Sequence, residues 1–218
     1  MKIVIAGSAD NALEIKRKFG EDHEYLVVAD HPIPLSGMDS GVIFDFLPET
    51  GVAHYSSYLE VESIHIFTYS LYRTLNELLN PQLGESGKIF GFCGWPTFVD
   101  RSLLEVSCYR NEAAELQEIC KELGTECRIV KDRVGMATPR VISMIINEAY
   151  YTVQEGTAEK AAVDQAMKLG TNYPMGPFEW AEMIGLKNVY KLLRVVYEDT
   201  QEERYKVCPL LKTEVNLL

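Results

Sequence analysis

The sequence predicts an α/β part followed by an all-helical part. Residues 2–6, KIVIA, form a β-branched run that ends at Gly7, as the first strand and turn of a dinucleotide-binding fold do. Residues 141–153 are apolar almost all round, and residues 164–185 have the pattern of two helices joined by a turn. A chain of 218 residues that is 47% hydrophobic can form one large domain or two modest ones.

Composition narrows the class of protein. No apolar run approaches the roughly 20 residues of a membrane-spanning helix, and the N-terminus is unlike a signal peptide, so we expect a cytoplasmic protein without membrane contact. The net charge of −11 disfavours a nucleic-acid surface. The five cysteines form no C-x-x-C pair and are predicted to be reduced. All four histidines lie at or before His65, so we expect no metal site.

Further β-branched runs predict the rest of the sheet. We expect strands over residues 24–29, 41–46, 63–68, 88–93 and 127–130. The prolines and glycine of residues 31–40 predict a turn or loop. Residues 111–123 form an amphipathic helical pattern that ends at Gly124.

The glycine turn after the first strand departs from the nucleotide-binding pattern G-x-G-x-x-G. With Gly7 in the first position, Ala9 and Ala12 take the second and third. Alanine is acceptable in the third position, but a methyl group at Ala9 crowds the approach of a pyrophosphate. Asp10 adds a carboxylate where phosphates are normally received. We therefore favour a Rossmann-type strand and helix without a cofactor, with the binding of any dinucleotide weakened.

Two further features bear on the same site. Asn11 and Glu14 predict a capping box, which would use the free N–H groups of the helix internally. Asp30 follows the second strand, where an acidic residue binds an adenosine ribose. An ordinary turn residue is the alternative interpretation of Asp30.

Residues 164–185, DQAMKLGTNYPMGPFEWAEMIG, are the most informative stretch of the chain. They predict one helix that buries Val163 and Leu169 and ends at Gly170, a rigid turn over residues 173–177, and a second helix over residues 178–184. The stretch closely resembles the C-terminal domain of the 3-hydroxyacyl-CoA dehydrogenase family, whose members carry D-x-A-M-x-x-G-x-x-Y-P-M-G-P-F-E-L-x-D-x-x-G.

The resemblance implies a two-domain fold. We expect a reduced Rossmann-like, NAD-binding-type domain with a parallel sheet over residues 1–132 and a helical C-terminal-type domain over residues 133–218. A homodimer through the helical domain is also implied, and the apolar helix 141–153 favours it. The chain is identified as a shortened member, because it lacks the family's long helical segment between residues 30 and 41 and the final G-x-G-F-Y; its last helix is expected over residues 187–203.

The resemblance also places the family's four catalytic positions. Glu105, in L-E-V, matches the glutamate that orients the catalytic histidine. Cys93 stands at that histidine, and the spacing of 12 residues to Glu105 is the family's own. Tyr69 stands at the catalytic serine, with Ser70 beside it as a candidate after a one-residue slip. Pro139 replaces the asparagine of the family's V-N-R.

Cys93 is a poor replacement for a general base. A cysteine has a reference pKa of about 8.5, and a neighbouring carboxylate raises that pKa. No histidine follows His65 in the sequence to activate the thiol. We expect Cys93 to be a small buried residue, and Trp95 and Phe98 either to fill the vacated space or to line a new pocket.

Three functions follow from these observations. The first is a dehydrogenase-like protein that has lost ordinary dehydrogenase activity and serves as a dimeric binding or regulatory protein for a small-molecule or acyl-CoA ligand. The second is an active NAD-dependent oxidoreductase on a 3-hydroxyacyl-CoA or smaller 3-hydroxy substrate, using Glu105 with His65 or Tyr69 as the base. The third is a subunit that pairs with a complete relative. NAD binding separates the first two, and mixed dimers would indicate the third.

Overall fold

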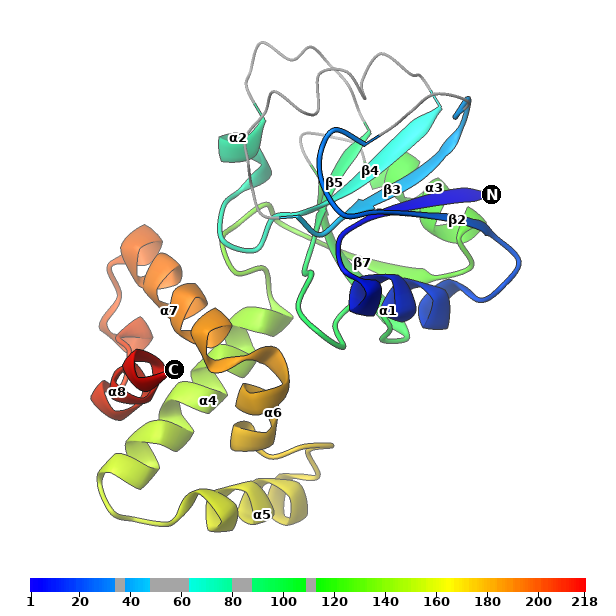
Figure 1. The fold of residues 1–218 in the computed structure, drawn as a ribbon. Helices are drawn as coiled ribbons and strands as arrows, with labels where there is room; N and C mark the ends of the chain where they lie inside the picture. The colour runs from blue at the N-terminus through cyan, green and yellow to red at the C-terminus, as the bar shows by residue number, and fades with distance from the viewer. Residues whose placement is uncertain (34–37, 48–62, 80–87, 109–112) are drawn as a thin grey trace. The chain divides into compact units, whose positions relative to one another are not determined.

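The chain forms two compact units in the computed structural model, Met1–Met136 and Ala137–Leu218 (Figure 1). The structure describes residues 1–33, 38–47, 63–79, 88–108 and 113–218. Residues 34–37 of the expected loop and residues 111–112 of the expected helix lie outside the described residues. The division between the units follows Met136, whereas the sequence indicated residue 132.

The first unit is built on one seven-stranded sheet with the strand order β2-β1-β3-β4-β5-β6-β7. Neighbouring strands are parallel, except that β6 runs antiparallel to β5. The strands are β1 (Lys2–Ala6), β2 (Glu24–Val28), β3 (Gly41–Asp45), β4 (Ile64–Tyr69), β5 (Ile89–Phe92), β6 (Leu103–Cys108) and β7 (Glu126–Val130). The helices of this unit are α1 (Ala9–Phe19), α2 (Leu75–Leu78) and α3 (Ala113–Glu122). The predicted fold class is confirmed, with a mostly parallel sheet.

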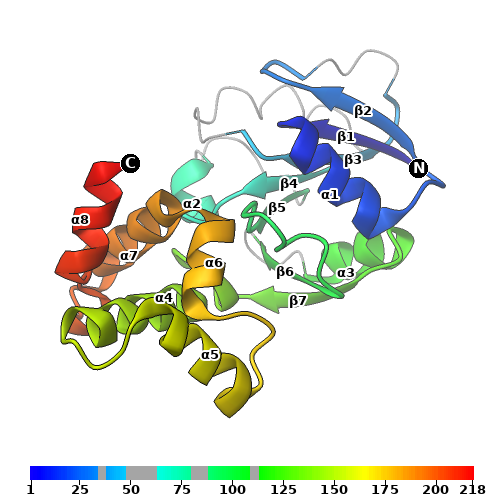
Figure 2. The ribbon, with the colours of Figure 1, turned by 60° about the horizontal axis from the view of Figure 1, so that its bottom comes forward.

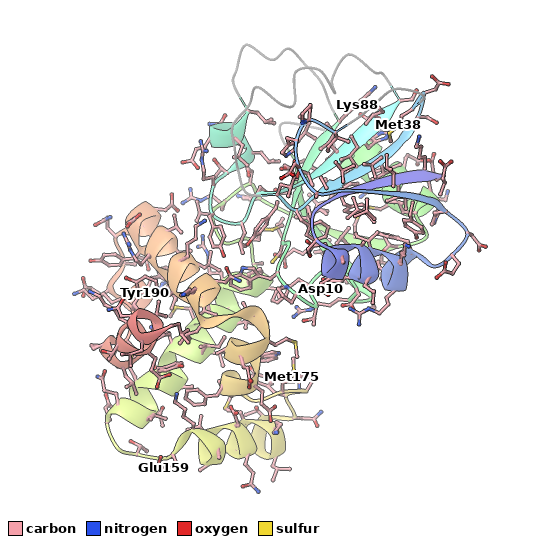
Figure 3. The ribbon with its side chains drawn as sticks, viewed as in Figure 1. Asp10, Met38, Lys88, Glu159, Met175 and Tyr190 are labelled. Atoms are coloured by element: carbon pink, nitrogen blue, oxygen red, sulfur yellow. The ribbon has the colours of Figure 1, made fainter. Side chains whose placement is uncertain are left out.

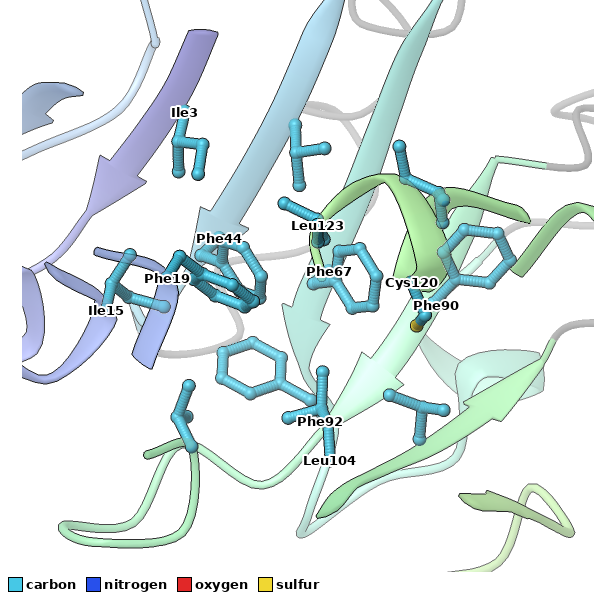
Figure 4. Packing of buried hydrophobic residues seen from close by; sticks show 14 of the residues in the cluster. Ile3, Ile15, Phe19, Phe44, Phe67, Phe90, Phe92, Leu104, Cys120 and Leu123 are labelled. Carbon is cyan, nitrogen blue, oxygen red and sulfur yellow. The ribbon is translucent and has the colours of Figure 1, made fainter. Parts of the chain in front are cut away.

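Both faces of the sheet are buried, because alternate side chains of its strands enter two separate apolar cores. One core joins α1 and α3 to the sheet, and Figure 4 shows its row of rings from Phe44, Phe67, Phe90 and Phe92. The Phe44 and Phe67 rings stack with centroids 4.8 Å apart. The other core contains mainly aliphatic side chains, including Val4, Ile43, Ile66 and Leu75. Strands buried on both faces explain the near-continuous apolar runs of the sequence.

The strand order creates one switch point in the sheet. β2 and β3 both pair with β1, on its opposite edges, so the chain reverses direction across the sheet after β2. Ligands of open α/β sheets bind at such a point, beyond the carboxyl ends of the strands. The candidate site is therefore sought at the carboxyl ends of β1, β3, β4 and β5.

The second unit contains helices and one short 3₁₀ turn among its residues, all of which the structure describes (Figure 2). The elements are α4 (Thr138–Gln154), α5 (Lys160–Thr171), α6 (Pro177–Ile184), α7 (Leu186–Thr200), the 3₁₀ turn (Glu203–Tyr205) and α8 (Pro209–Leu217). α4 packs against α6, α7 and α8. The sequence did not predict α8, and α7 ends three residues before the predicted end at residue 203.

The end of α5 corrects a prediction. Gly170 lies inside α5, and the helix ends instead at Thr171, with Asn172 as the C-cap, whose φ of 57° is left-handed. Asparagine tolerates this conformation, which commonly ends helices. Leu169 is 78% exposed, whereas Val163 and Asp164 are buried. The prediction that Leu169 faces inward was therefore wrong.

Asp164 has a structural role at the start of the next helix. Its carboxylate accepts a hydrogen bond of 2.8 Å from the Phe178 N–H in the first turn of α6. A Cβ at Gly176 would lie less than 3.0 Å from Asp164 side-chain atoms, so the carboxylate packs directly on this glycine. Glu179 accepts a second bond, from the Gly176 N–H, and also pairs with Lys168. The most recognisable stretch of the sequence thus encodes the junction of α5 and α6.

Polar side chains of α4 hold the end of the chain. Asn147 accepts the Cys208 N–H at 2.9 Å and donates to the Lys206 carbonyl at 2.8 Å. Tyr150 donates its hydroxyl to Glu214, which also pairs with Lys160. These contacts fix the position of α8 on α4.

Candidate functional site

The sheet brings three of the sequence-predicted positions to one edge. Tyr69 and Phe92 are register partners at the carboxyl ends of β4 and β5. The antiparallel register of β5 and β6 pairs Phe92 with Val106, so Cys93 and Glu105 are the residues next to this last register pair. The 12-residue spacing of Cys93 and Glu105 thus covers the loop that connects the adjacent strands β5 and β6.

Cys93 is buried beside two carboxylates. Burial raises the pKa of its thiol above the ordinary value, and the charges of Glu105 and Glu14 add to the rise. A hydrogen bond from the backbone N–H of Trp95 lowers this pKa in part. The raised pKa leaves the thiol protonated at neutral pH. Protonated cysteine is neither a nucleophile nor a proton acceptor of useful strength.

Glu105 has a cationic neighbour. It is half-buried in β6, and the guanidinium of Arg101 interacts electrostatically with both Glu105 and Cys93. Arg101 is itself fixed, because its Nε donates to the Thr97 carbonyl at 3.1 Å and its guanidinium lies 3.7 Å from the centre of the Phe98 ring. A positive charge that acts on Glu105 is therefore that of an arginine, where the resemblance implies a histidine.

Ser70 is buried within the sheet. Its Oγ makes no hydrogen bond among the described residues and lies against Gly91, where a Cβ would come within 3.0 Å of the Ser70 and Ser107 hydroxyls. Gly91 makes room for these two hydroxyl groups on neighbouring strands. A serine placed in this way does not present its hydroxyl to a ligand at the edge of the sheet.

Aromatic rings occupy the carboxyl edge instead. A Cβ at Gly94 would lie 3.1 Å from the Phe46 ring and 3.2 Å from the Tyr69 ring, so both rings pack on the Gly94 backbone. The Phe46 ring also meets the Phe92 ring edge-on at 5.0 Å. The ends of β3, β4 and β5 are thus covered by side chains of the protein itself.

Trp95 and Phe98 pack against each other after β5. Both side chains are buried, and their rings meet at right angles with centroids 5.5 Å apart. The indole N–H of Trp95 donates to the buried Tyr72 hydroxyl at 3.0 Å. This packing favours the first of the two alternatives, in which the two rings fill space.

The start of α1 is closed by a capping box, but its members differ from the predicted pair. Ser8 accepts the Asn11 N–H at 3.2 Å, and the Asn11 side chain accepts the Ser8 N–H at 2.9 Å. The prediction of Asn11 and Glu14 was wrong, because Ser8 is the residue with extended backbone before the helix. Asp10 lies in the first turn of α1, as Figure 3 shows.

Glu14 binds a loop far away in the sequence. Its carboxylate is buried and accepts the Val99 N–H at 3.0 Å and the Asp100 N–H at 3.4 Å. Burial raises the pKa of Glu14, and these two N–H groups oppose the rise. Lys18, one turn further along α1, donates to the carbonyls of Arg101 and Ser102. The loop between β5 and β6 is therefore docked on α1, which sequence reasoning missed.

Asp30, which follows β2, is exposed. The charged contact next to it is formed by His31 and Asp45. His31 Nε2 lies 3.3 Å from the buried carboxylate of Asp45, at the end of β3. Asp45 also accepts the Leu47 N–H at 3.0 Å. The buried acid of this corner is thus Asp45, and it already has protein partners.

These residues do not fit a dinucleotide well. Gly7 is buried with the Asn11 amide and Phe46 against it: a Cβ there would lie 2.7 Å from Asn11 Oδ1 and 3.1 Å from Phe46 Cβ. Ala9 is exposed at the start of α1, and Ala12 is on the buried side of the same helix. The Ser8 and Asn11 N–H groups are already bonded, and Asp10 would repel a pyrophosphate.

The remaining candidates lie elsewhere. His65 is near the amino end of β4, where its Nε2 lies 3.1 Å from Glu115 of α3, so β4 does not bring it to Glu105. Pro139 is buried in the first turn of α4, in the second unit. The four replaced or retained catalytic positions are thus divided between the units. Among the described residues, no helix is long and apolar enough to cross a membrane.

Sequence comparison identifies the helical unit. Residues 135–217 match the family model described as 3-hydroxyacyl-CoA dehydrogenase, C-terminal domain. A probable 3-hydroxybutyryl-CoA dehydrogenase of Bacillus subtilis is 37% identical over 103 residues, which are 47% of this chain and 36% of the relative. The 3-hydroxyadipyl-CoA dehydrogenase of Escherichia coli is 41% identical over 83 residues, 38% of this chain and 18% of the relative. The matches thus span about a third or less of these two relatives.

Structural comparison extends the likeness to the whole chain. The structure of FadB2 from M. tuberculosis superposes with a TM-score of 0.77 at 15% identity, covering 99% of this chain and 93% of that one. The (S)-3-hydroxybutyryl-CoA dehydrogenase PaaH1 from Ralstonia eutropha gives a TM-score of 0.75 at 17% identity, with the same coverage of 99% and 93%. At such low identity these superpositions establish the fold and nothing of the chemistry.

Proposed function

We propose that this 3-hydroxyacyl-CoA dehydrogenase-like protein has lost the ordinary dehydrogenase reaction and serves as a dimeric binding or regulatory protein. The observation that carries the proposal is Cys93. At the position of the family's general base it offers a buried thiol of raised pKa beside Glu105. A missing general base alone costs about 10²- to 10⁴-fold in rate.

The packing around Cys93 supports the same proposal. The rings of Phe46 and Tyr69 cover Gly94, and the loop between β5 and β6 is fixed to α1 through Glu14. Dehydrogenation needs a hydride acceptor, and the residues at the start of α1 are poorly suited to hold NAD. Binding and chemistry are therefore both weakened at this edge of the sheet.

Exposed apolar side chains on the helical unit favour a dimer. Val141 in α4 is 57% exposed, and Met183 in α6 is also exposed. We place the test of the dimer here because the family resemblance implies a dimer through this unit, and these two residues are among its exposed large hydrophobic side chains. Val141→Glu is expected to produce monomers in sedimentation velocity, whereas Leu13→Glu, at an equally exposed leucine of α1, leaves the dimer intact. A wild-type monomer would refute the dimeric part of the proposal.

The decisive experiment is a titration of the full-length protein with NAD and NADH, followed by acetoacetyl-CoA. Binding is read from calorimetry and from the fluorescence of Trp95 and Trp180, and turnover from NADH absorbance, with an active 3-hydroxybutyryl-CoA dehydrogenase as the positive control. We expect no saturable binding at micromolar concentrations and no NADH oxidation. Micromolar NADH affinity with turnover would refute the loss of activity.

The same titration tests the alternative, an active oxidoreductase that uses Glu105 with a non-standard base. Tyr69 is a better candidate for that base than His65, because Tyr69 is half-buried at the carboxyl edge and is the register partner of Phe92. Turnover that Tyr69→Phe abolishes would establish it. Mixed dimers formed with an active relative would instead support a subunit role.

A further inference from the structure

The turn between α3 and β7 brings two cysteines together. Cys120 lies in the last turns of α3 and is 1% exposed, and Figure 4 shows it against Phe90 in the core. Cys127 is the second residue of β7 and is half-buried. Gly124 reverses the chain between them with a φ of 70°, and the Thr125 N–H closes the turn on the Cys120 carbonyl at 2.9 Å. The Cys127 thiol is among the groups that raise the pKa of Cys120, together with the Cys108 thiol.

Both cysteines line one cavity of about 560 Å³ at the surface of the first unit. Its charged lining residues are Lys121, Arg128 and Glu126, so positive charge is in excess there. This excess is local, because the whole chain carries a net charge of −11. The cavity therefore admits a small anionic molecule to the half-buried Cys127, while Cys120 stays beneath it in the core.

We propose that Cys120 and Cys127 form a redox-active dithiol that reacts with small anionic disulfides of the glutathione type. The proposal is independent of the dehydrogenase-like site, which lies at the carboxyl edge of β4 and β5. A disulfide exchange needs an accessible thiolate to attack and a second thiol held beside it. Cys127 supplies the first and Cys120 the second.

The reaction balances without any other reagent. The Cys127 thiolate attacks one sulfur of the small disulfide, forms a mixed disulfide and releases the first small thiol. Cys120 then attacks the Cys127 sulfur, breaks the mixed bond and releases the second small thiol. The two protein thiols lose two electrons, which reduce the small disulfide, and their two protons leave on the released thiols.

The order of the two steps follows from exposure and charge. Burial raises the pKa of Cys120, and Lys18 opposes the rise only in part, so Cys120 is a poor first nucleophile. Cys127 is half-buried and lines the cavity together with Lys121 and Arg128, whose charges attract carboxylates. Cys120 needs only to reach a sulfur that is already its neighbour.

The test uses the full-length protein with oxidised glutathione as the probe. Peptide mapping by mass spectrometry is expected to find a Cys120–Cys127 disulfide, three remaining free thiols of the five, and no glutathione on the wild-type chain. Cys120→Ser should trap glutathione on Cys127, whereas Cys127→Ser should leave Cys120 unmodified. Cys208→Ser, at a buried cysteine of the other unit, should behave as wild type.

Two outcomes would overturn the proposal. One is a wild-type protein that keeps all five thiols free, or that accumulates glutathione on Cys127, under conditions that oxidise a model dithiol. The other is oxidation of Cys120 in the Cys127→Ser variant. Circular dichroism of each variant confirms that serine leaves the fold intact, and Cys127→Ala provides a second substitution.

The role of the cavity charge has its own control. Lys121→Glu is expected to slow the reaction with oxidised glutathione several-fold at low salt, and salt should reduce the difference because it screens exposed charges. A neutral disulfide such as hydroxyethyl disulfide should react equally with both proteins. Equal slowing for both disulfides would refute the charge argument.

Discussion

The two glycines of the helical unit's recognisable stretch should respond oppositely to alanine. A Cβ at Gly176 would overlap the Asp164 carboxylate, which lies less than 3.0 Å from that position. A Cβ at Gly170 would meet nothing within 4 Å, and this glycine lies in the exposed interior of α5. Gly176→Ala and Gly170→Ala are thus a matched pair, separated by six residues and identical in chemistry.

The magnitudes follow from what each methyl group displaces. Gly176→Ala forces Asp164 away from the Phe178 N–H, and a hydrogen bond to a charged group contributes about 1.5 to 3 kcal/mol. Since 1 kcal/mol corresponds to roughly 4 to 8 °C in a unit of this size, Tm should fall by on the order of 10 °C. Gly170→Ala should raise stability by about 0.5 to 1 kcal/mol, because it restricts the unfolded chain and favours the helix.

Thermal unfolding followed by calorimetry and far-UV circular dichroism measures both effects. An Asp164→Gly background removes both the carboxylate and the Asp164 Cβ that would lie 2.4 Å from the new methyl group, so Gly176→Ala should cost much less there. Equal effects of Gly176→Ala in both backgrounds, or destabilisation by Gly170→Ala, would refute the explanation of this stretch by the Asp164 contact.

Three further predictions concern the first unit. Because burial raises the pKa of Glu14, the folded state holds this proton more tightly than the unfolded state, and stability falls as pH rises from the ordinary glutamate value through the raised one. Glu14→Gln should abolish that fall in urea titrations and keep the Val99 bond, whereas Glu14→Ala should cost about 1 to 3 kcal/mol. Gly91→Ala should lower Tm because its methyl overlaps the Ser70 hydroxyl, whereas Ser70→Ala should be nearly neutral. Cys93 should resist iodoacetamide at neutral pH until the protein unfolds, as peptide mapping would report.

Each of these has a contrary outcome. An unchanged pH dependence in Glu14→Gln would show that another group titrates. If Gly91→Ala is as stable as the wild type, the strands next to β5 accommodate the methyl group without a cost in free energy of unfolding. Rapid alkylation of Cys93 in the folded protein would reopen its candidacy as a nucleophile.

Much of the fold could be predicted because its signals are local. Residues 2–6 became a strand as expected, since a β-branched run before glycine has few other solutions. The 12-residue spacing of Cys93 and Glu105 came from the family resemblance, and the sequence did not predict that β5 and β6 run antiparallel. The hairpin turn at residues 173–177 was clear from its prolines.

The missed features depend on contacts between distant residues. Glu14 and Lys18 have the spacing of a local helical ion pair, yet both bind a loop more than 80 residues away. α8 has no strong sequence pattern of its own. Its position depends on side chains of α4 such as Asn147, which bond to the residues just before it. Gly170 carried a stop signal that the αL conformation of Asn172 overrode.

The Asp164 contact also explains why a protein of this kind is easy to classify and hard to interpret. The residues of this stretch are constrained by the geometry of the junction between α5 and α6, which the fold needs whether or not the protein turns over a substrate. Mutations at Cys93 or Pro139 leave that joint untouched. The sequence match over residues 135–217 therefore reports that this joint is present and carries no information about chemistry in the first unit.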